Sequence, residues 1–188
     1  SREFCNLSEV VIRHNDTPQS LRDKVRIATI LGTFQSTLTN FKYLSKEWQR
    51  NCEEERLLGV SLTGIMDSPL TNGSKDTIKK LLNELREVAV KTNIEYAEKL
   101  GIERSVSITC VKPSGTVSQL VDSASGIHAR HNPYYIRTVR ADNKDPLCKM
   151  MKAKGFPNEP DVTKPEHTSV FSFPAKSPKG AICRKDMT

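Results

Sequence analysis

Five consecutive residues in the middle of this 188-residue chain have the composition of a phosphate-binding turn: Ser114, Gly115, Thr116, Val117 and Ser118. They follow an apolar segment at 105–111 and begin a short amphipathic stretch. If the segment is a strand and the stretch is a helix, backbone N–H groups and hydroxyls gather at the helix N-terminus. Unpaired donors and the positive end of the helix dipole favour an anion there. Gly115 would let the chain approach a phosphate closely. The alternative is an ordinary helix cap after a strand, which needs no ligand.

The turn has the spacing of neither common nucleotide motif. A Walker-type loop ends in Gly-Lys-Ser/Thr, whereas Lys112 precedes this turn. The turn also lacks the Gly-x-Gly-x-x-Gly fingerprint of dinucleotide-binding folds. Phosphate binding would therefore depend on the backbone donors and hydroxyls of the turn itself.

Cysteine is the second residue type that could carry chemistry. The chain has five cysteines, an odd number with no Cys-x-x-Cys spacing, which argues against a zinc ribbon and a secreted disulfide framework. We interpret them as thiols in a reducing compartment. Cys5 lies in a strand-like segment, where a cysteine is most simply a small buried residue. His128 and His131 have no third ligand nearby in the sequence, so we expect no metal site.

The periodicity of the chain predicts alternating strands and helices. Helical spacing follows Thr17-Pro18 and recurs over 75–100, where Gly101 ends the pattern. A third helix is expected near 146–154. Strands are expected at about 3–12, 105–111, 134–140 and 169–173, with an apolar segment at 57–62, a loop at 68–74, and a linker-like stretch at 155–165. This alternation predicts a mainly parallel α/β fold, with residues 1–188 as a single partial domain.

Composition and charge narrow the functional classes. The chain is 36% hydrophobic and 27% charged, with no signal peptide and no apolar run long enough to cross a membrane, so we expect a cytoplasmic protein. Its formal charge is +7, of which residues 1–127 carry +1 and residues 128–188 carry +6. Basic side chains from Arg130 to Lys154, interleaved with Tyr134 and Tyr135, could contact nucleic acid. We favour a solvated surface that attracts a polyphosphate.

Several motifs, taken in order, resemble one enzyme family. They are Cys-Asn-Leu-Ser-Glu-Val at 5–10, Arg-Leu-Leu-Gly-Val-Ser-Leu-Thr-Gly at 56–64, Lys-Pro-Ser-Gly-Thr-Val-Ser-Gln-Leu at 112–120, and Ser-Gly-Ile-His-Ala-Arg-His at 125–131. Together they closely resemble the catalytic subunit of ribonucleotide reductases, most of all the adenosylcobalamin-dependent branch. The resemblance covers nearly the whole chain. The Asn-x-Cys-x-Glu segment, which carries the radical cysteine and the catalytic glutamate of that family, is not in the sequence, so we expect a piece of an enzyme that is inactive alone.

The resemblance implies a fold and a set of roles. The family has a ten-stranded α/β barrel with helices outside, and this chain would correspond to much of its second half. Cys5 matches one of two barrel cysteines that supply electrons and end as a disulfide, and Ser114–Ser118 match the substrate-phosphate loop. Adenosylcobalamin would be the cofactor, a ribonucleotide the substrate, and a thioredoxin-like protein the reductant. The remainder of the reductase chain would be a further partner. Cys52, Cys148 and Cys183 would be structural, and Cys110 would pack beneath the turn.

Two alternatives remain open at this point. One is a metal-cofactor reductase of the same superfamily, whose radical comes from a separate subunit. The other is a basic nucleic-acid-binding or scaffold module, which would show strongly salt-dependent affinity for DNA or RNA and no nucleotide binding. The sequence does not distinguish diphosphate from triphosphate substrates, because both present phosphates to the same turn.

Overall fold

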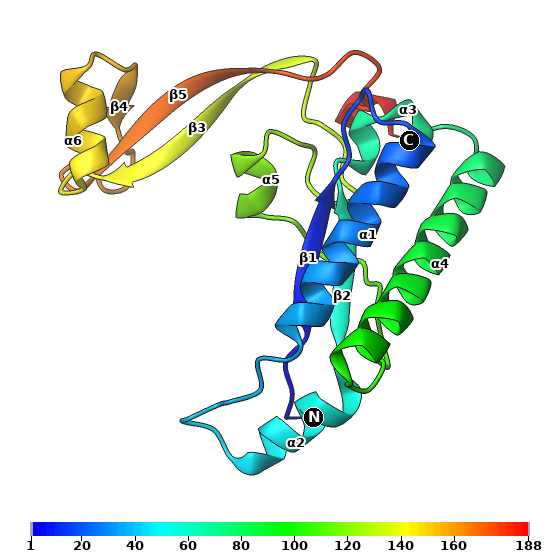
Figure 1. Ribbon diagram of the computed structural model, residues 1–188. Helices are drawn as coiled ribbons and strands as arrows, with labels where there is room; N and C mark the ends of the chain where they lie inside the picture. The colour runs from blue at the N-terminus through cyan, green and yellow to red at the C-terminus, as the bar shows by residue number, and fades with distance from the viewer. Residues whose placement is uncertain (1, 188) are drawn as a thin grey trace. The chain divides into compact units, whose positions relative to one another are not determined.

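The computed structural model describes residues 2–187, which form two compact units (Figure 1). Unit 1 comprises Ser1–Arg130 with Pro178–Thr188, and unit 2 comprises His131–Ser177. Each unit contains its own small sheet. The predicted α/β class is confirmed; residues 2–187 contain a two-stranded and a three-stranded sheet, and their place in half of a ten-stranded barrel stays a prediction. That residues 1–188 act as one partial domain stays a prediction.

Two long helices in unit 1 begin and end at clear sequence signals. α1 (Pro18–Gln35) follows Thr17, whose hydroxyl accepts a backbone N–H in a capping box. α4 (Lys75–Leu100) follows the N-cap Ser74 and ends at Gly101, whose φ of 63° suits a residue without a side chain. Both helices lie where the sequence predicts them.

The other helices of unit 1 are short. They are α2 (Lys46–Glu55), α3 (Pro69–Asn72) and α5 (Thr116–Leu120), with 3-10 turns at Ile65–Asp67 and Arg184–Asp186. α3 corrects the loop predicted at 68–74: Ser68 caps it, and Pro69 fits the first helical position. No helix among residues 2–187 has both the length and the apolar character to cross a membrane.

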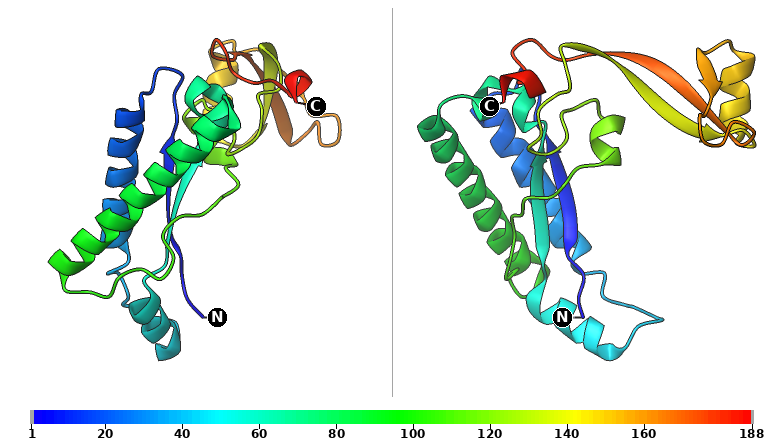
Figure 2. Two further views of the ribbon diagram at one scale, coloured as in Figure 1. Left: turned by 90° about the vertical axis from the view of Figure 1, so that its right-hand side faces the viewer. Right: turned by 180° about the vertical axis from the view of Figure 1, so that it is seen from behind.

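The sheet of unit 1 pairs two parallel strands, β1 (Asn6–Val11) and β2 (Leu58–Thr63), in a register that places Asn6 beside Leu58 and Val11 beside Thr63. Parallel strands need a long crossover, and here α1 and α2 supply it. Figures 1 and 2 show α1 and α4 on one side of the sheet and α5 on the other.

The predicted strand at 105–111 is present only as an extended segment beside β2. Val60 donates its N–H to the Ile108 carbonyl at 2.9 Å and accepts from the Cys110 N–H at 3.1 Å, and Thr109 forms a single parallel bridge with Val60. Leu58 also donates its N–H to the Ser107 carbonyl at 2.9 Å, and Pro113, further along the segment, has no N–H to donate to a ladder. The prediction of a regular strand here is therefore wrong, although its place next to β2 holds.

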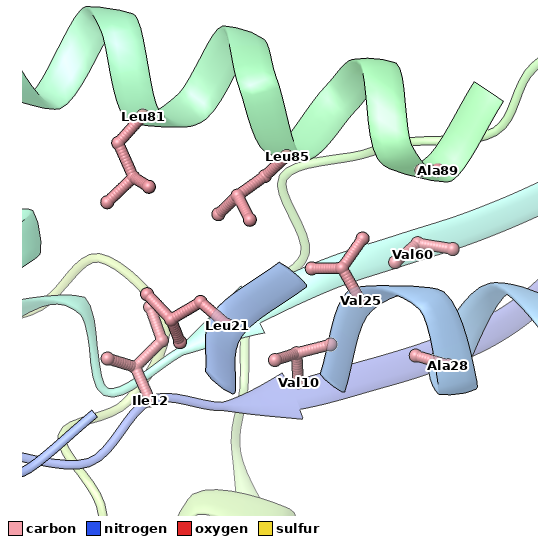
Figure 3. Close-up of a cluster of buried hydrophobic side chains, with 9 residues drawn as sticks. All are labelled: Val10, Ile12, Leu21, Val25, Ala28, Val60, Leu81, Leu85 and Ala89. Carbon is pink, nitrogen blue, oxygen red and sulfur yellow. The ribbon is translucent and has the colours of Figure 1, made fainter. Parts of the chain in front are cut away.

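The hydrophobic core of unit 1 lies between the sheet and the two long helices (Figure 3). The strands contribute buried Val10 and Val60, Ile12 directly follows β1, and the helices contribute Leu21, Val25, Ala28, Leu81, Leu85 and Ala89. Burying a branched aliphatic side chain stabilises the fold by about 1.5–3 kcal/mol. Because strand side chains alternate between faces, the residues between these core positions must point to the other side of the sheet.

Unit 2 is built on antiparallel pairs, which corrects the mainly parallel arrangement predicted from the sequence. β3 (Tyr134–Asp142) pairs with β5 (Thr168–Lys176), and β4 (Asn158–Pro160) pairs with the other edge of β5. α6 (Pro146–Ala153) lies between β3 and β4 in the sequence, with Asp145 as its N-cap. β4 also falls within the stretch predicted as a linker, so this proline-rich segment is part of the sheet.

Candidate functional site

The face of the unit 1 sheet opposite α1 and α4, here called the open face, carries the residues singled out from the sequence. On β1, Glu9 alternates with the core residue Val10, and on β2, Gly59 and Thr63 alternate with Val60. Cys5 directly precedes β1 and continues the same alternation. The elements that form the core on one side thus present polar and sulfur-containing side chains on the other.

Cys5 and Cys110 meet above a glycine on this face. A side-chain Cβ at Gly59 would lie 3.1 Å from the Sγ atoms of both Cys5 and Cys110, and closer still to Leu7. The two sulfurs are therefore separated by no more than twice that distance. Gly59 makes room for them because it has no side chain. Both thiols are exposed, which corrects the expectation that Cys110 packs beneath the turn.

Although both residues are exposed overall, their thiols are partly buried, and the raised pKa values of both favour the protonated form. Burial, followed by the neighbouring Cys110 and Glu3, raises the pKa of the Cys5 thiol above its ordinary value of 9.0. Burial also raises the pKa of Cys110, although Lys112 opposes this shift. A protonated thiol can donate a hydrogen atom, whereas a thiolate cannot. The protonated thiol is also the less nucleophilic of the two forms.

Alkylation should report these raised pKa values. Because iodoacetamide reacts with the thiolate, modification of Cys5 and Cys110 should be slower than that of the same cysteines in the denatured chain, and its rate should keep rising above about pH 9. Peptide mass spectrometry across a pH series measures both sites. A rate at Cys5 that reaches its plateau below the pH at which the denatured chain does so would contradict the raised pKa.

The predicted turn and helix are present at 113–118. α5 begins at Thr116 with Gly115 as its N-cap, so residues 114–118 form a turn that opens a helix of five residues. A Cβ at Gly115 would meet no atom within 4 Å, so the space beside the turn is open. The first N–H groups of any helix lack intrahelical acceptors, so they are available for a ligand that enters this space. Their convergence on an anion stays a prediction.

The two serine hydroxyls of the turn are hydrogen-bonded within the protein. Ser114 Oγ donates to Glu9 Oε1 at 2.5 Å, and Ser118 Oγ donates to the Gly115 carbonyl at 2.7 Å. The Ser125 hydroxyl donates to the Ser114 carbonyl. In this arrangement the protons of the Ser114 and Ser118 hydroxyls are occupied, so the backbone N–H groups and the Thr116 hydroxyl are the donors of the turn that remain for a ligand.

A buried ion pair fixes the loop behind the turn. Arg130 donates from Nε to Asp67 Oδ1 at 2.8 Å and from Nη2 to Asp67 Oδ2 at 2.9 Å, and both side chains are 3% exposed. Asp67 Oδ2 also accepts the Ala124 N–H at 2.7 Å, and Thr63 Oγ1 accepts the Gly126 N–H at 2.8 Å. Arg130 was expected on a solvated basic surface, and its burial corrects that expectation.

The remaining candidates take no part in the open face. His128 and His131 are exposed, and residues 2–187 contain no cluster of three or more His, Cys, Asp or Glu side chains that could hold a metal ion. Cys52, Cys148 and Cys183 are buried thiols, as predicted for structural cysteines. The sequence reasoning missed Glu9 and Asp67. Glu9 could have been found, because it shares the alternation of Cys5 along the same strand.

Known proteins resemble this chain in both sequence and structure. An adenosylcobalamin-dependent ribonucleoside-triphosphate reductase of Lactobacillus gasseri is 35% identical over 200 residues, covering 93% of this chain and 26% of the relative. A reductase of the same name from Euglena gracilis is 28% identical over 191 residues, covering 100% of this chain and 25% of the relative. A crystal structure of a B12-dependent (class II) ribonucleotide reductase matches with a TM-score of 0.76 at 26% identity, over 95% of this chain and 28% of that chain. No protein-family model matches the chain.

The chain therefore belongs to the ribonucleotide reductase family and corresponds to a segment of the large reductase chain. More specifically, the chain is homologous to a part of the adenosylcobalamin-dependent, class II reductases, which confirms the resemblance seen in the sequence motifs. It spans about a quarter of the length of these relatives.

Proposed function

We propose that this chain supplies one redox cysteine and the substrate-phosphate turn of an adenosylcobalamin-dependent ribonucleotide reductase. The observation that carries the proposal is the position of Cys5 and of the turn at 114–118. Both belong to the open face of one sheet, in a chain homologous to class II reductases. Neither the metal-cofactor alternative nor the nucleic-acid-binding alternative is favoured by the relatives.

In this proposal the turn binds the substrate and the cysteine supplies electrons. Backbone donors of residues 114–118 hold the anionic end of the nucleotide, which orients the ribose over the thiols. Reduction of the 2′ carbon releases the hydroxyl as water, and two cysteine thiols lose two electrons and two protons to become a disulfide. Cys5 is one of the two, and a second cysteine of the complete enzyme is its partner. A thioredoxin-like protein then restores both thiols by exchange.

Adenosylcobalamin, when bound, would supply the radical that starts this reaction. We assign no residue between 2 and 187 to the cofactor.

Replacing Gly115 with valine tests the phosphate turn. The substitution fills the open space beside the turn, so we expect about tenfold weaker binding of a ribonucleotide by the complete enzyme, equivalent to about 1.4 kcal/mol. Alanine at the same position should have a smaller effect. Isothermal titration with CTP, CDP and cytidine measures the affinity of each variant, and cytidine is the control because it has no phosphate. Equal loss of cytidine and CTP affinity would contradict a phosphate-specific role.

A further inference from the structure

We propose that Glu9 is a positioning residue for the phosphate turn: it anchors Ser114 and balances the charge of Lys112, so that backbone N–H groups rather than a lysine bind the substrate phosphate. This inference rests on the proposed function of the turn. It assigns a role to a side chain that lies far from the turn in the sequence and is brought to it by the fold.

The carboxylate of Glu9 contacts two residues at the turn, Ser114 and Lys112. Its Oε1 accepts the Ser114 hydroxyl at 2.5 Å, and its Oε2 lies 3.7 Å from Lys112 Nζ. The Glu9 side chain is only 10% exposed, and Oε2 is buried without a hydrogen-bond partner. An isolated buried carboxylate is costly, so its neighbours must compensate its charge. The two groups that do so belong to the segment that enters the turn.

This burial separates Glu9 from the ordinary surface ion pairs of the chain. In the Arg104–Glu98 pair, for example, the side chains are 60% and 63% exposed, and water screens their charges. Lys112, by contrast, is 29% exposed, and its partner is nearly enclosed. The Glu9–Lys112 pair therefore interacts through a medium of lower effective dielectric constant, where charge matters more.

The charge arrangement affects the ligand directly. A carboxylate beside a phosphate site repels the phosphate unless a cation offsets it. Lys112 provides that offset, and its attraction to Glu9 keeps it from acting as a free phosphate-binding cation. The Ser114 hydroxyl proton is likewise taken by Glu9. The turn is thus left close to neutral apart from its oriented N–H groups.

A double-mutant cycle in the complete enzyme tests this role. Lys112→Ala leaves the Glu9 charge uncompensated, so we expect about tenfold weaker CTP and CDP binding. Glu9→Gln can still accept the Ser114 hydroxyl and removes the negative charge, so it should bind both nucleotides at least as tightly as the wild type. In the double variant, Glu9→Gln should recover most of the affinity lost with Lys112→Ala. Glu98→Gln with Arg104→Ala is the matched exposed pair, and it should show no effect and no coupling.

Cytidine separates positioning of the phosphate turn from a general structural role. Its affinity should stay within about twofold in all variants, because it has no phosphate to be repelled. Additive effects of Glu9→Gln and Lys112→Ala, or parallel losses of cytidine and CTP affinity, would overturn the inference. If Gly115→Val weakens CTP binding while the cycle is additive, only the role of Glu9 fails. If Gly115→Val has no effect either, the proposed phosphate turn itself fails.

Discussion

Replacing Asp67 with asparagine should destabilise the chain by about 3–5 kcal/mol. The substitution leaves the Arg130 guanidinium buried beside a neutral amide, and breaking a buried pair by removing one partner has this cost. The Ala124 N–H also loses a charged acceptor. Urea denaturation of wild type and variant measures the difference as a shift of the midpoint at constant slope.

Glu98→Gln is the control for this experiment. It removes a carboxylate from an exposed pair with Arg104, so the free energy of unfolding should change by less than about 1 kcal/mol. Arg130 also contacts the exposed Asp122. Its Nη1 lies 3.1 Å from Asp122 Oδ1, and its Nη2 donates to the Asp122 carbonyl. A loss below about 1 kcal/mol in Asp67→Asn would mean that Asp122 compensates the buried charge and that Asp67 does not fix this loop.

Replacing Cys5 with serine should abolish sustained turnover in the complete enzyme. Serine keeps the size and polarity of the side chain but cannot form a disulfide, so the two electrons for reduction have no source. Nucleotide binding should be unchanged, because the turn at 114–118 is intact. Product formation over many turnovers, together with CTP binding by titration, distinguishes loss of chemistry from loss of substrate.

Cys148→Ala provides the comparison for the cysteine experiment. This thiol is buried in unit 2, so its replacement should lower stability without stopping turnover at a temperature where the protein remains folded. Many turnovers by Cys5→Ser at the wild-type rate would remove Cys5 from the mechanism. The proposal does not require Cys110→Ser to lose turnover, because Cys110 lies beside Cys5 but has no assigned electron-transfer role.

Local signals in the sequence were sufficient for the two long helices of unit 1. Ser74 and Gly101 mark the ends of α4, and Thr17 marks the start of α1, because caps act within a few residues. The direction in which strands pair is not set by such local signals. Periodicity shows that β3 and β5 are strands but does not show that they are antiparallel, since pairing depends on how the chain returns between them. The mainly parallel prediction failed for that reason.

The candidate site shows the same division between local and distant information. The turn at 114–118 could be predicted because glycine, hydroxyl residues and a preceding apolar segment are adjacent in the sequence. The pairing of Ser114 with Glu9 joins residues 105 positions apart, and that of Arg130 with Asp67 joins residues 63 positions apart. The count of basic residues along the chain predicted that Arg130 lies on a basic surface, because such a count does not detect a partner as distant in sequence as Asp67. Only the fold brings these residues together.

The most direct test of the central proposal is an assay of 2′-deoxyribonucleotide formation by the complete enzyme, with CDP and CTP offered separately. The assay is run with and without adenosylcobalamin in the presence of a dithiol reductant, and a separate assay uses prereduced protein without added reductant. We predict product from at least one substrate only when adenosylcobalamin is present, and product limited to about one equivalent per enzyme when the reductant is then withheld from prereduced protein. Formation of product without adenosylcobalamin would contradict the class II assignment. Binding of DNA or RNA with steep salt dependence and no nucleotide reduction would contradict the proposed function as a whole.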